Sequence, residues 1–165
     1  VLVYNFVDMI SHAKKDVNLI KELAKNDKAY RSLTVSWYNN SNLKKIINKA
    51  KDLGYKIIIT TDHGTINVDT PSIVSGDKEI SNNLRYKTAK RINSESKSSI
   101  NLSDPSKFLL PSNHLGSCFI FAKENTYFVY SNNYNNYVKM FKNTYQHGGV
   151  SLEEMLIPFV VIKPR

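Results

Sequence analysis

The chain has 165 residues, of which 41% are hydrophobic and 11% aromatic, so it can bury a core and is not a disordered chain. Its formal net charge of +9 favours an anionic partner, but only four of the 23 basic residues are arginine and the lysines are scattered, which argues against a nucleic-acid groove. No apolar run is long enough to cross a membrane, and Cys118 stands alone, so we expect a cytoplasmic protein without an internal disulfide.

The chain begins with an apolar run over residues 1–7 that predicts a buried strand. Because a natural chain seldom starts with such a strand and without methionine, we interpret the sequence as part of a longer protein. Asp8 and His12 follow the run. At the start of a helix, their four-residue spacing would place both side chains on one face, where they could bind a metal. Alternatively, Asp8 caps the helix and His12 packs against its next turn.

A helical region follows the first strand. Helices are expected over residues 16–24, 30–38 and 42–53. The first and last of these have apolar residues at the spacing of a helix face that packs against a core. Ser41 is a residue type that begins helices, and Gly54 is the type that ends them, so both ends of the last helix are predicted from the sequence.

The next apolar run, residues 56–61, is β-branched and typical of a strand buried on both faces of a parallel sheet. With residues 1–7 and the intervening helices, it would form a βαβ unit that brings Asp8 and Asp62 to one edge of the sheet. The expected fold class is therefore α/β, with a mostly parallel sheet flanked by helices, in a single domain over residues 1–165.

This second strand ends at Asp62-His63-Gly64. An acid beside an imidazole at the carboxyl end of a strand offers two metal ligands on a rigid support, and Gly64 lets the backbone turn away sharply. The alternative is an ordinary turn, in which Asp62 accepts hydrogen bonds from loop amides and His63 is exposed. Three-residue matches are common, so this motif alone does not decide between them.

Residues 65–110 have only a weak pattern, in which prolines and a glycine punctuate polar stretches, and residues 94–99 are expected to form a mobile loop. Within this region, residues 83–87 are a basic cluster that could hold an anion, because Arg85 offers a bidentate fork and Lys87 a point charge. Arg85 and Lys87 are therefore candidate substrate-binding residues. The alternative is a solvated basic turn.

The last third of the chain contains a third histidine motif. Residues 117–122 and 126–130 suit a β-hairpin, and aromatic residues at helical spacing predict a helix over residues 134–145. His147 is then followed by two glycines, which permit a tight backbone path. A capping-box pattern, residues 151–154, starts a short helix before a closing strand over residues 155–162.

These motifs together offer five metal ligands, which are Asp8, His12, Asp62, His63 and His147. Oxygen and nitrogen ligands without cysteine suit zinc or a similar divalent ion, and five are too many for one catalytic zinc with an open position. Two metal ions a few ångströms apart fit better. Such a pair can clamp the attacking and leaving oxygens of a phosphoryl group.

The order D-x-x-x-H, T-D-H-G and H-G-G, before a final helix and strand, resembles the alkaline phosphatase superfamily. The fuller text, with TTDHG, NNLRYK, NNYNNYV and QHGGVSLEEM, is most similar to the PglZ domain found at the carboxyl end of PorX-type response regulators. The resemblance extends over residues 1–165. It implies an alkaline phosphatase-like core, of which this chain would be the carboxyl-terminal part.

The resemblance also implies roles for the ligands. Asp8, His12 and His147 would bind one zinc, while Asp62 and His63 would contribute to a second. In the family, the second zinc also takes an earlier aspartate and a nucleophilic Thr or Ser that precedes the D-x-x-x-H motif, so the nucleophile is expected upstream of this chain. We therefore expect this part of the domain to be inactive by itself.

The function that the resemblance implies is zinc-dependent phosphodiester hydrolysis, with nucleotides or short oligonucleotides as substrates and a receiver domain upstream. One alternative is a PglZ scaffold without catalytic activity that acts in signalling or dimerisation, and a homodimer would suit it. Another is a basic nucleic-acid-binding domain, which would bind more weakly at high salt and would not need a metal.

Overall fold

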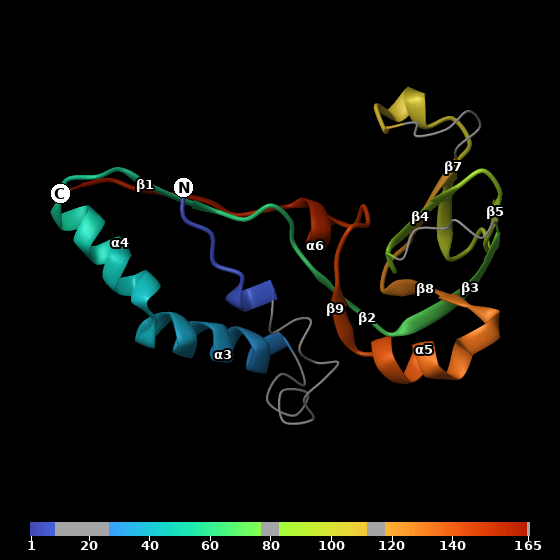
Figure 1. Ribbon diagram of the computed structural model, residues 1–165, viewed down its shortest axis with the longest axis horizontal. Helices are drawn as coiled ribbons and strands as arrows, with labels where there is room; N and C mark the ends of the chain where they lie inside the picture. Colours follow the sequence, from blue (N-terminus) through green and yellow to red (C-terminus); the bar gives the residue numbers. More distant parts are fainter. Residues whose placement is uncertain (9–26, 77–82, 112–117, 165) are drawn as a thin grey trace. The chain divides into compact units, whose positions relative to one another are not determined.

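The computed structural model describes residues 1–8, 27–76, 83–111 and 118–164, which form two compact units (Figure 1). Unit 1 comprises Val1–Asp62 and Ile157–Arg165, and unit 2 comprises His63–Leu156. The expected helix over residues 16–24 and the candidate ligand His12 lie outside the described residues. In the described part of the chain, no helix combines the length and the apolar character that crossing a membrane requires.

The helices of unit 1 confirm two sequence predictions. They are α3 (Asp27–Asn40) and α4 (Asn42–Asp52). Ser41 caps α4, since its hydroxyl accepts a hydrogen bond from the Lys44 N–H at 3.4 Å, and Gly54 follows the end of α4 with a φ of +79°. Trp37 of α3 stacks on Phe6 with 4.2 Å between ring centroids, so the amino-terminal segment packs against this helix.

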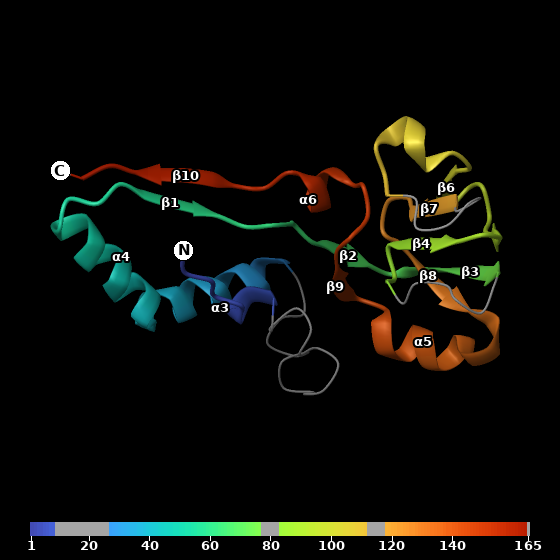
Figure 2. The same ribbon diagram turned by 45° about the horizontal axis from the view of Figure 1, so that its top comes forward.

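The strands of unit 1 differ from the prediction. β1 (Ile57–Thr60) pairs antiparallel with β10 (Phe159–Ile162), and the two run side by side (Figure 2). Residues 1–5 are not a strand and residues 6–8 are helical, so the expected βαβ unit is wrong. Burial on both faces is wrong too, because Ile58 is 54% exposed. A β-branched run favours an extended backbone but does not determine which strand pairs with it or in which direction.

Unit 2 is rich in short strands. Its strands are β2 (Ile66–Val68), β3 (Thr70–Gly76), β4 (Tyr86–Ala89), β5 (Ile92–Asn93), β6 (Ser99–Leu102), β7 (Cys118–Ala122), β8 (Thr126–Tyr130) and β9 (Thr144–Gln146). Its helices are α5 (Tyr134–Phe141) and α6 (Leu152–Met155), with 3-10 turns at Pro105–Phe108 and Ser131–Asn133. The described strands are therefore concentrated where the sequence pattern was weakest.

Most strand pairs of unit 2 are antiparallel. β2 pairs with β9, β3 pairs with β5, and β7 lies between β4 and β6. Among the described strands, β3 and β8 form the one parallel pair. The expectation of a mostly parallel sheet is thus wrong, although the fold is mixed α/β. The expected hairpin is also wrong, because β7 and β8, on either side of the turn at residues 123–125, belong to different sheets.

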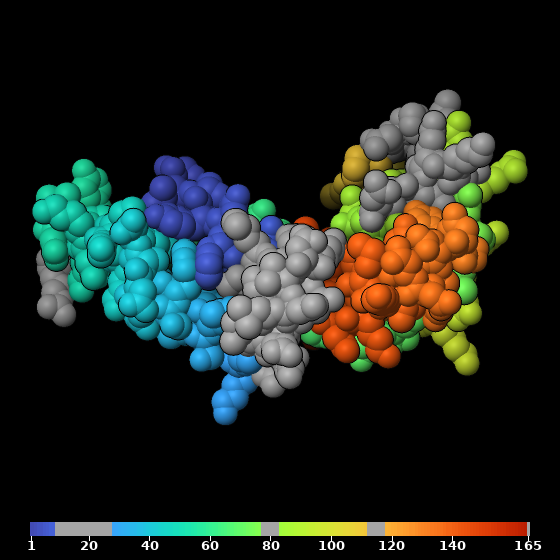
Figure 3. Space-filling model, turned by 60° about the horizontal axis from the view of Figure 1, so that its bottom comes forward, coloured from blue at the N-terminus to red at the C-terminus, as the bar shows by residue number. Residues whose placement is uncertain are grey.

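Strand β8 lies at the centre of the core of unit 2. Tyr127 and Val129 face a cluster with Val68, Leu84 and Phe141, whereas Phe128 faces a second cluster with Val74, Ile120 and Ala122. Alternate residues of a strand point to opposite faces, so β8 is buried on both. α5 covers the first face, and its outer side chains form a continuous stretch of the surface of unit 2 (orange in Figure 3). Each buried Val or Phe stabilises this core by about 1.5 to 3 kcal/mol.

Candidate metal centre

His63 begins unit 2, just before β2. Its Nδ1 lies 3.0 Å from the carbonyl oxygen of Gly64. A carbonyl oxygen can only accept a hydrogen bond, so this contact favours the tautomer with the proton on Nδ1 and the lone pair on Nε2. Metal-binding histidines are commonly oriented in this way. In this tautomer the half-buried ring has its acceptor lone pair on Nε2, the nitrogen that could bind a metal.

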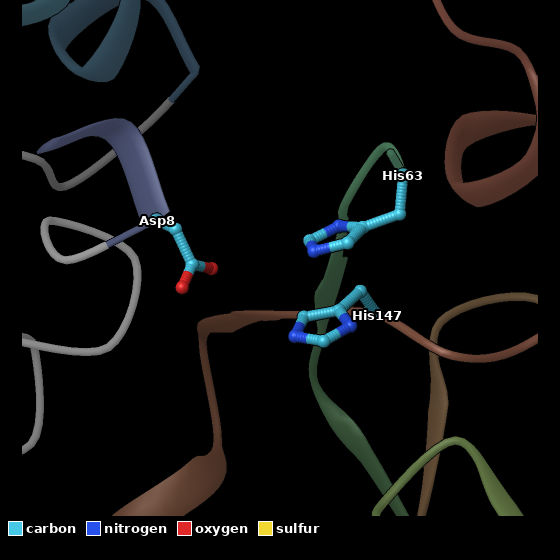
Figure 4. Close-up of side chains that lie close together, drawn as sticks. All are labelled: Asp8, His63 and His147. Atoms are coloured by element: carbon cyan, nitrogen blue, oxygen red, sulfur yellow. The ribbon is translucent and has the colours of Figure 1, made fainter. Parts of the chain in front are cut away.

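His147 directly follows β9, and the pairing of β9 with β2 brings it to His63. Ile66 and Gln146 pair at the end of this antiparallel ladder, so the residues before β2 and after β9 leave it at the same end. The two imidazole rings are stacked, with 3.8 Å between their centroids and 13° between their planes (Figure 4). One ring nitrogen of each lies within 4.8 Å of the other.

This spacing fits a divalent metal. Two imidazole nitrogens bound to one tetrahedral zinc lie about 3.3 Å apart, because each is about 2.0 to 2.1 Å from the ion. Two neighbouring ions in a hydrolase lie about 3.5 to 4 Å apart. Both arrangements suit nitrogens within 4.8 Å. Imidazole lone pairs lie in the ring planes, so the two nearly parallel rings of His63 and His147 fit two neighbouring zinc ions better than one.

The predicted carboxylate ligands belong to unit 1. Asp62 is exposed at the end of the segment that carries β1, directly before His63, and its carboxylate lies 3.4 Å from the Thr61 hydroxyl. Asp8 is helical, like residues 6 and 7 before it, and is half-buried. Figure 4 draws the Asp8 side chain, which ends in its two carboxylate oxygens.

Tyr30 of α3 holds the backbone next to Asp8. Its hydroxyl donates a hydrogen bond to the Val7 carbonyl oxygen at 2.9 Å. Burial of Tyr30, helped by the negative charge of Asp8, raises its pKa to about 12. The phenol therefore stays a proton donor at physiological pH. The sequence has no pattern that marks Tyr30, because the contact joins two segments that are far apart in the chain.

Arg85 and Lys87 are buried inside unit 2, with exposed fractions of 0%. The Arg85 guanidinium binds Glu154 in a bidentate manner, with Nε to Oε1 and Nη2 to Oε2 both at 3.0 Å, and its Nη1 donates to the Thr126 carbonyl oxygen. Lys87 lies 4.7 Å above the centre of the Tyr130 ring, and burial lowers its pKa to about 8. Arg85 thus has a role other than the substrate contact that we expected.

Glu154 has several partners besides Arg85. Its Oε1 accepts a hydrogen bond from the Gly149 N–H at 2.9 Å, and its Oε2 accepts one from the Ser151 N–H at 3.2 Å. Burial opposes ionisation of Glu154, but the hydrogen bonds and charge of Arg85 outweigh it and hold the pKa of this carboxyl below its usual value. The contact with Ser151 confirms the predicted capping box, whereas the ion pair was not predicted.

A comparison with protein families identifies the family of the chain. The family model described as the BREX system PglZ alkaline phosphatase-like domain matches residues 1–162. The chain belongs to this PglZ family. The predicted resemblance to the PglZ domain of the alkaline phosphatase superfamily is thereby confirmed, and this domain suggests a hydrolase-like fold. No curated protein sequence matches the chain at a significant level.

Proposed function

We propose that this PglZ domain supplies zinc ligands for a phosphodiester hydrolase. The observation that supports the proposal best is the stacked pair of His63 and His147, which come from distant motifs and meet at one end of the β2–β9 ladder. The hydrogen bond from Nδ1 of His63 to a carbonyl oxygen adds to it, because it favours the tautomer with the lone pair on Nε2, as in metal-binding histidines. Neither feature is needed to fill the hydrophobic core.

The proposed site has two zinc ions. Asp8, His12 and His147 bind the first, and Asp62 and His63 contribute to the second, as in the family that the motifs resemble. Zinc, when bound, would supply positive charge that stabilises phosphoryl oxygens during displacement. The protein's own part is to orient the imidazoles and carboxylates. By the same resemblance, the nucleophile is a Thr or Ser that precedes the D-x-x-x-H motif.

The proposed substrates are phosphodiesters such as nucleotides or short oligonucleotides. The formal net charge of +9 supports an anionic substrate, since it raises the local concentration of anions near the domain. The proposed setting is the effector domain of a response regulator, with a receiver domain before it. This setting rests on the similarity of the TTDHG and QHGGVSLEEM motifs to PorX-type regulators.

The test combines metal content with hydrolysis. The full-length protein is purified and assayed for bound zinc and for hydrolysis of bis-p-nitrophenyl phosphate. We expect zinc-dependent hydrolysis that His147→Ala abolishes, because that variant loses a metal ligand. His114→Ala serves as the matched control, since His114 belongs to none of the three motifs.

Three outcomes would count against the proposal that the domain is a zinc-dependent hydrolase. If the zinc-loaded protein binds zinc through His147 but hydrolyses no phosphodiester, the domain is a scaffold without catalytic activity, and the test would turn to dimerisation and signalling. If hydrolysis persists in His147→Ala at full rate, the reaction uses other residues. A protein that binds oligonucleotides equally well with and without a chelator would favour the nucleic-acid-binding alternative.

A further inference from the structure

We propose that Glu154 and Arg85 are positioning residues that hold His63 and His147 at the spacing a metal requires. This inference rests on the proposed function, since it concerns the same metal site. Glu154 is 4% exposed and Arg85 is fully buried, so their ion pair is shielded from water. Neither side chain is a metal ligand in the proposed site. Both act through the backbone of the two loops that carry the histidines.

The Glu154 side chain holds the loop that carries His147. Its two oxygens accept hydrogen bonds from the N–H groups of Gly149 and Ser151, which follow His147 closely in the sequence. A hydrogen bond from a backbone N–H to an ionised carboxylate is stronger than one to a neutral acceptor. The carboxylate therefore fixes the path of the backbone that leaves His147.

The Glu154 main chain holds the loop that carries His63. Its carbonyl oxygen accepts a hydrogen bond from the Gly64 N–H at 2.9 Å, and the Gly64 carbonyl oxygen in turn accepts the hydrogen bond from Nδ1 of His63. A Cβ at Gly64 would lie 2.0 Å from the Glu153 carbonyl oxygen, so only glycine allows this close approach. One residue thus contacts both histidine loops through different atoms.

Arg85 connects this arrangement to the core. Its guanidinium neutralises the Glu154 carboxylate and also donates to the Thr126 carbonyl oxygen at the start of β8. The side-chain oxygen of the neighbouring Asn83 accepts a hydrogen bond from the Arg85 backbone N–H at 2.7 Å. Its Nδ2 donates a hydrogen bond to the His147 carbonyl oxygen at 3.3 Å. The segment before β4 therefore contacts the His147 loop directly through Asn83 and indirectly through Arg85 and Glu154.

Stability alone does not explain the pair. Burying two charges is costly, and an apolar pair of similar volume often stabilises a fold as well or better. An apolar pair, however, could not accept the hydrogen bonds that the N–H groups of Gly149 and Ser151 donate. The ion pair therefore provides what an apolar pair cannot, which is a fixed backbone around His147.

The test measures zinc affinity in Glu154→Gln by competition with a chromophoric chelator. Glutamine keeps the size of the side chain but loses its charge, so the contacts with Gly149 and Ser151 weaken and Arg85 loses its counter-ion. We expect zinc affinity to fall about 10- to 100-fold, as for other residues that orient metal ligands. The matched control is Glu153→Gln, which removes the same charge from the exposed neighbour and should leave zinc affinity unchanged.

A second variant separates positioning from folding. Arg85→Met/Glu154→Met removes both charges together and leaves no buried charge unpaired, which favours a folded protein. We expect a cooperative thermal transition but the same loss of zinc affinity. A folded double variant that binds zinc as tightly as the unsubstituted protein would overturn the proposal.

The imidazole nitrogens give a readout that does not depend on metal. Long-range ¹H–¹⁵N spectra report on the ring nitrogens of both histidines, and we expect the ring signals of His147 to shift in Glu154→Gln because its loop loses contacts with the side chain, whereas His63 keeps the Nδ1–H tautomer because Glu154 contacts its loop through the main chain. If the unsubstituted protein binds no zinc, the proposed function fails, and this spectrum still decides whether Glu154 orients the His147 ring. Unchanged ring signals of His147 and unchanged zinc affinity in Glu154→Gln would refute the positioning role.

Discussion

A methyl group added at Gly149 should uncouple Glu154 from the His147 loop. A Cβ at Gly149 would lie 2.5 Å from Oε2 and 2.9 Å from Oε1 of Glu154. The carboxylate cannot swing aside freely, because Arg85 holds both of its oxygens. Gly149→Ala must therefore push the ion pair away and break the hydrogen bond from the residue 149 N–H.

The expected cost follows from these contacts. A buried hydrogen bond to a charged group contributes about 1.5 to 3 kcal/mol, and overpacking adds about 1 kcal/mol or more. We expect Gly149→Ala to lower the free energy of unfolding of unit 2 by about 2 to 4 kcal/mol. Gly54→Ala is the matched control, since nothing lies within 4 Å of its added Cβ and only its φ of +79° costs about 1 kcal/mol.

Hydrogen exchange measured by mass spectrometry at increasing urea concentrations would report each unit separately. Peptides from β2 and β9 should lose protection in Gly149→Ala, whereas Gly54→Ala should affect peptides from α4 and β1 instead. If Gly149→Ala costs unit 2 less than about 1 kcal/mol, the carboxylate is not held as the contacts with Arg85 indicate, and the reasoning fails.

Three further predictions concern buried groups. Tyr30→Phe should destabilise unit 1 by about 1 kcal/mol through loss of its hydrogen bond to Val7, measured by urea titration of Trp37 fluorescence; an unchanged midpoint would contradict it. Lys87→Met should stabilise unit 2 at pH 7 by an amount on the order of 1 to 3 kcal/mol, because burial lowers the lysine pKa to about 8. The folded state then binds fewer protons than the unfolded state, so the advantage of the variant should shrink as the pH rises from about 8 to about 10.5, and a constant advantage would count against this. The stabilisation from ionised Glu154 should be present above its unfolded pKa of about 4.3 and disappear as the pH falls through its lower folded pKa, and acid titration by circular dichroism should find no such step in Glu154→Gln.

Helix α4 and its ends were predictable because their signals are local, whereas the helix predicted over residues 134–145 ends at Phe141 and is followed by β9. Ser41 and Gly54 act on neighbouring residues, and the apolar spacing in α4 lies within a few turns. Strand pairing was not predictable in the same way. The run over residues 57–60 favours a strand, but its antiparallel partner lies almost at the other end of the chain. The prediction of a parallel sheet supplied a partner that the sequence did not specify.

The short strands of residues 65–110 were missed for a related reason. β3 contains Pro71, which the sequence reading took as punctuation of a polar stretch. Pro71 nevertheless lies within the parallel pair with β8, opposite Tyr127. β8 supplies much of the apolar surface of this core, so its neighbours can be short and partly polar. Strands that β8 covers can therefore form without the alternation of apolar and polar residues by which a strand is recognised in a sequence.

The candidate site was likewise predictable only where its signals are local. His63 and His147 could be found because each lies beside glycine in a short motif, and the PglZ resemblance followed from the order of these motifs. The role of Arg85 could not be found from the sequence. Its guanidinium does hold a carboxylate in a bidentate manner, as its chemistry suggested, but that carboxylate belongs to Glu154 of the same chain. Only the folded structure brings the two together.

The most direct test of the account is to follow the ring nitrogens of His63 and His147 by ¹⁵N NMR while zinc is added. We predict that Nε2 of His63 and one nitrogen of His147 both change their chemical shifts as zinc binds, with Nδ1 of His63 still protonated, because the two rings form one metal centre. If zinc binds and neither ring responds, the metal lies elsewhere and the stacked histidines are not its ligands.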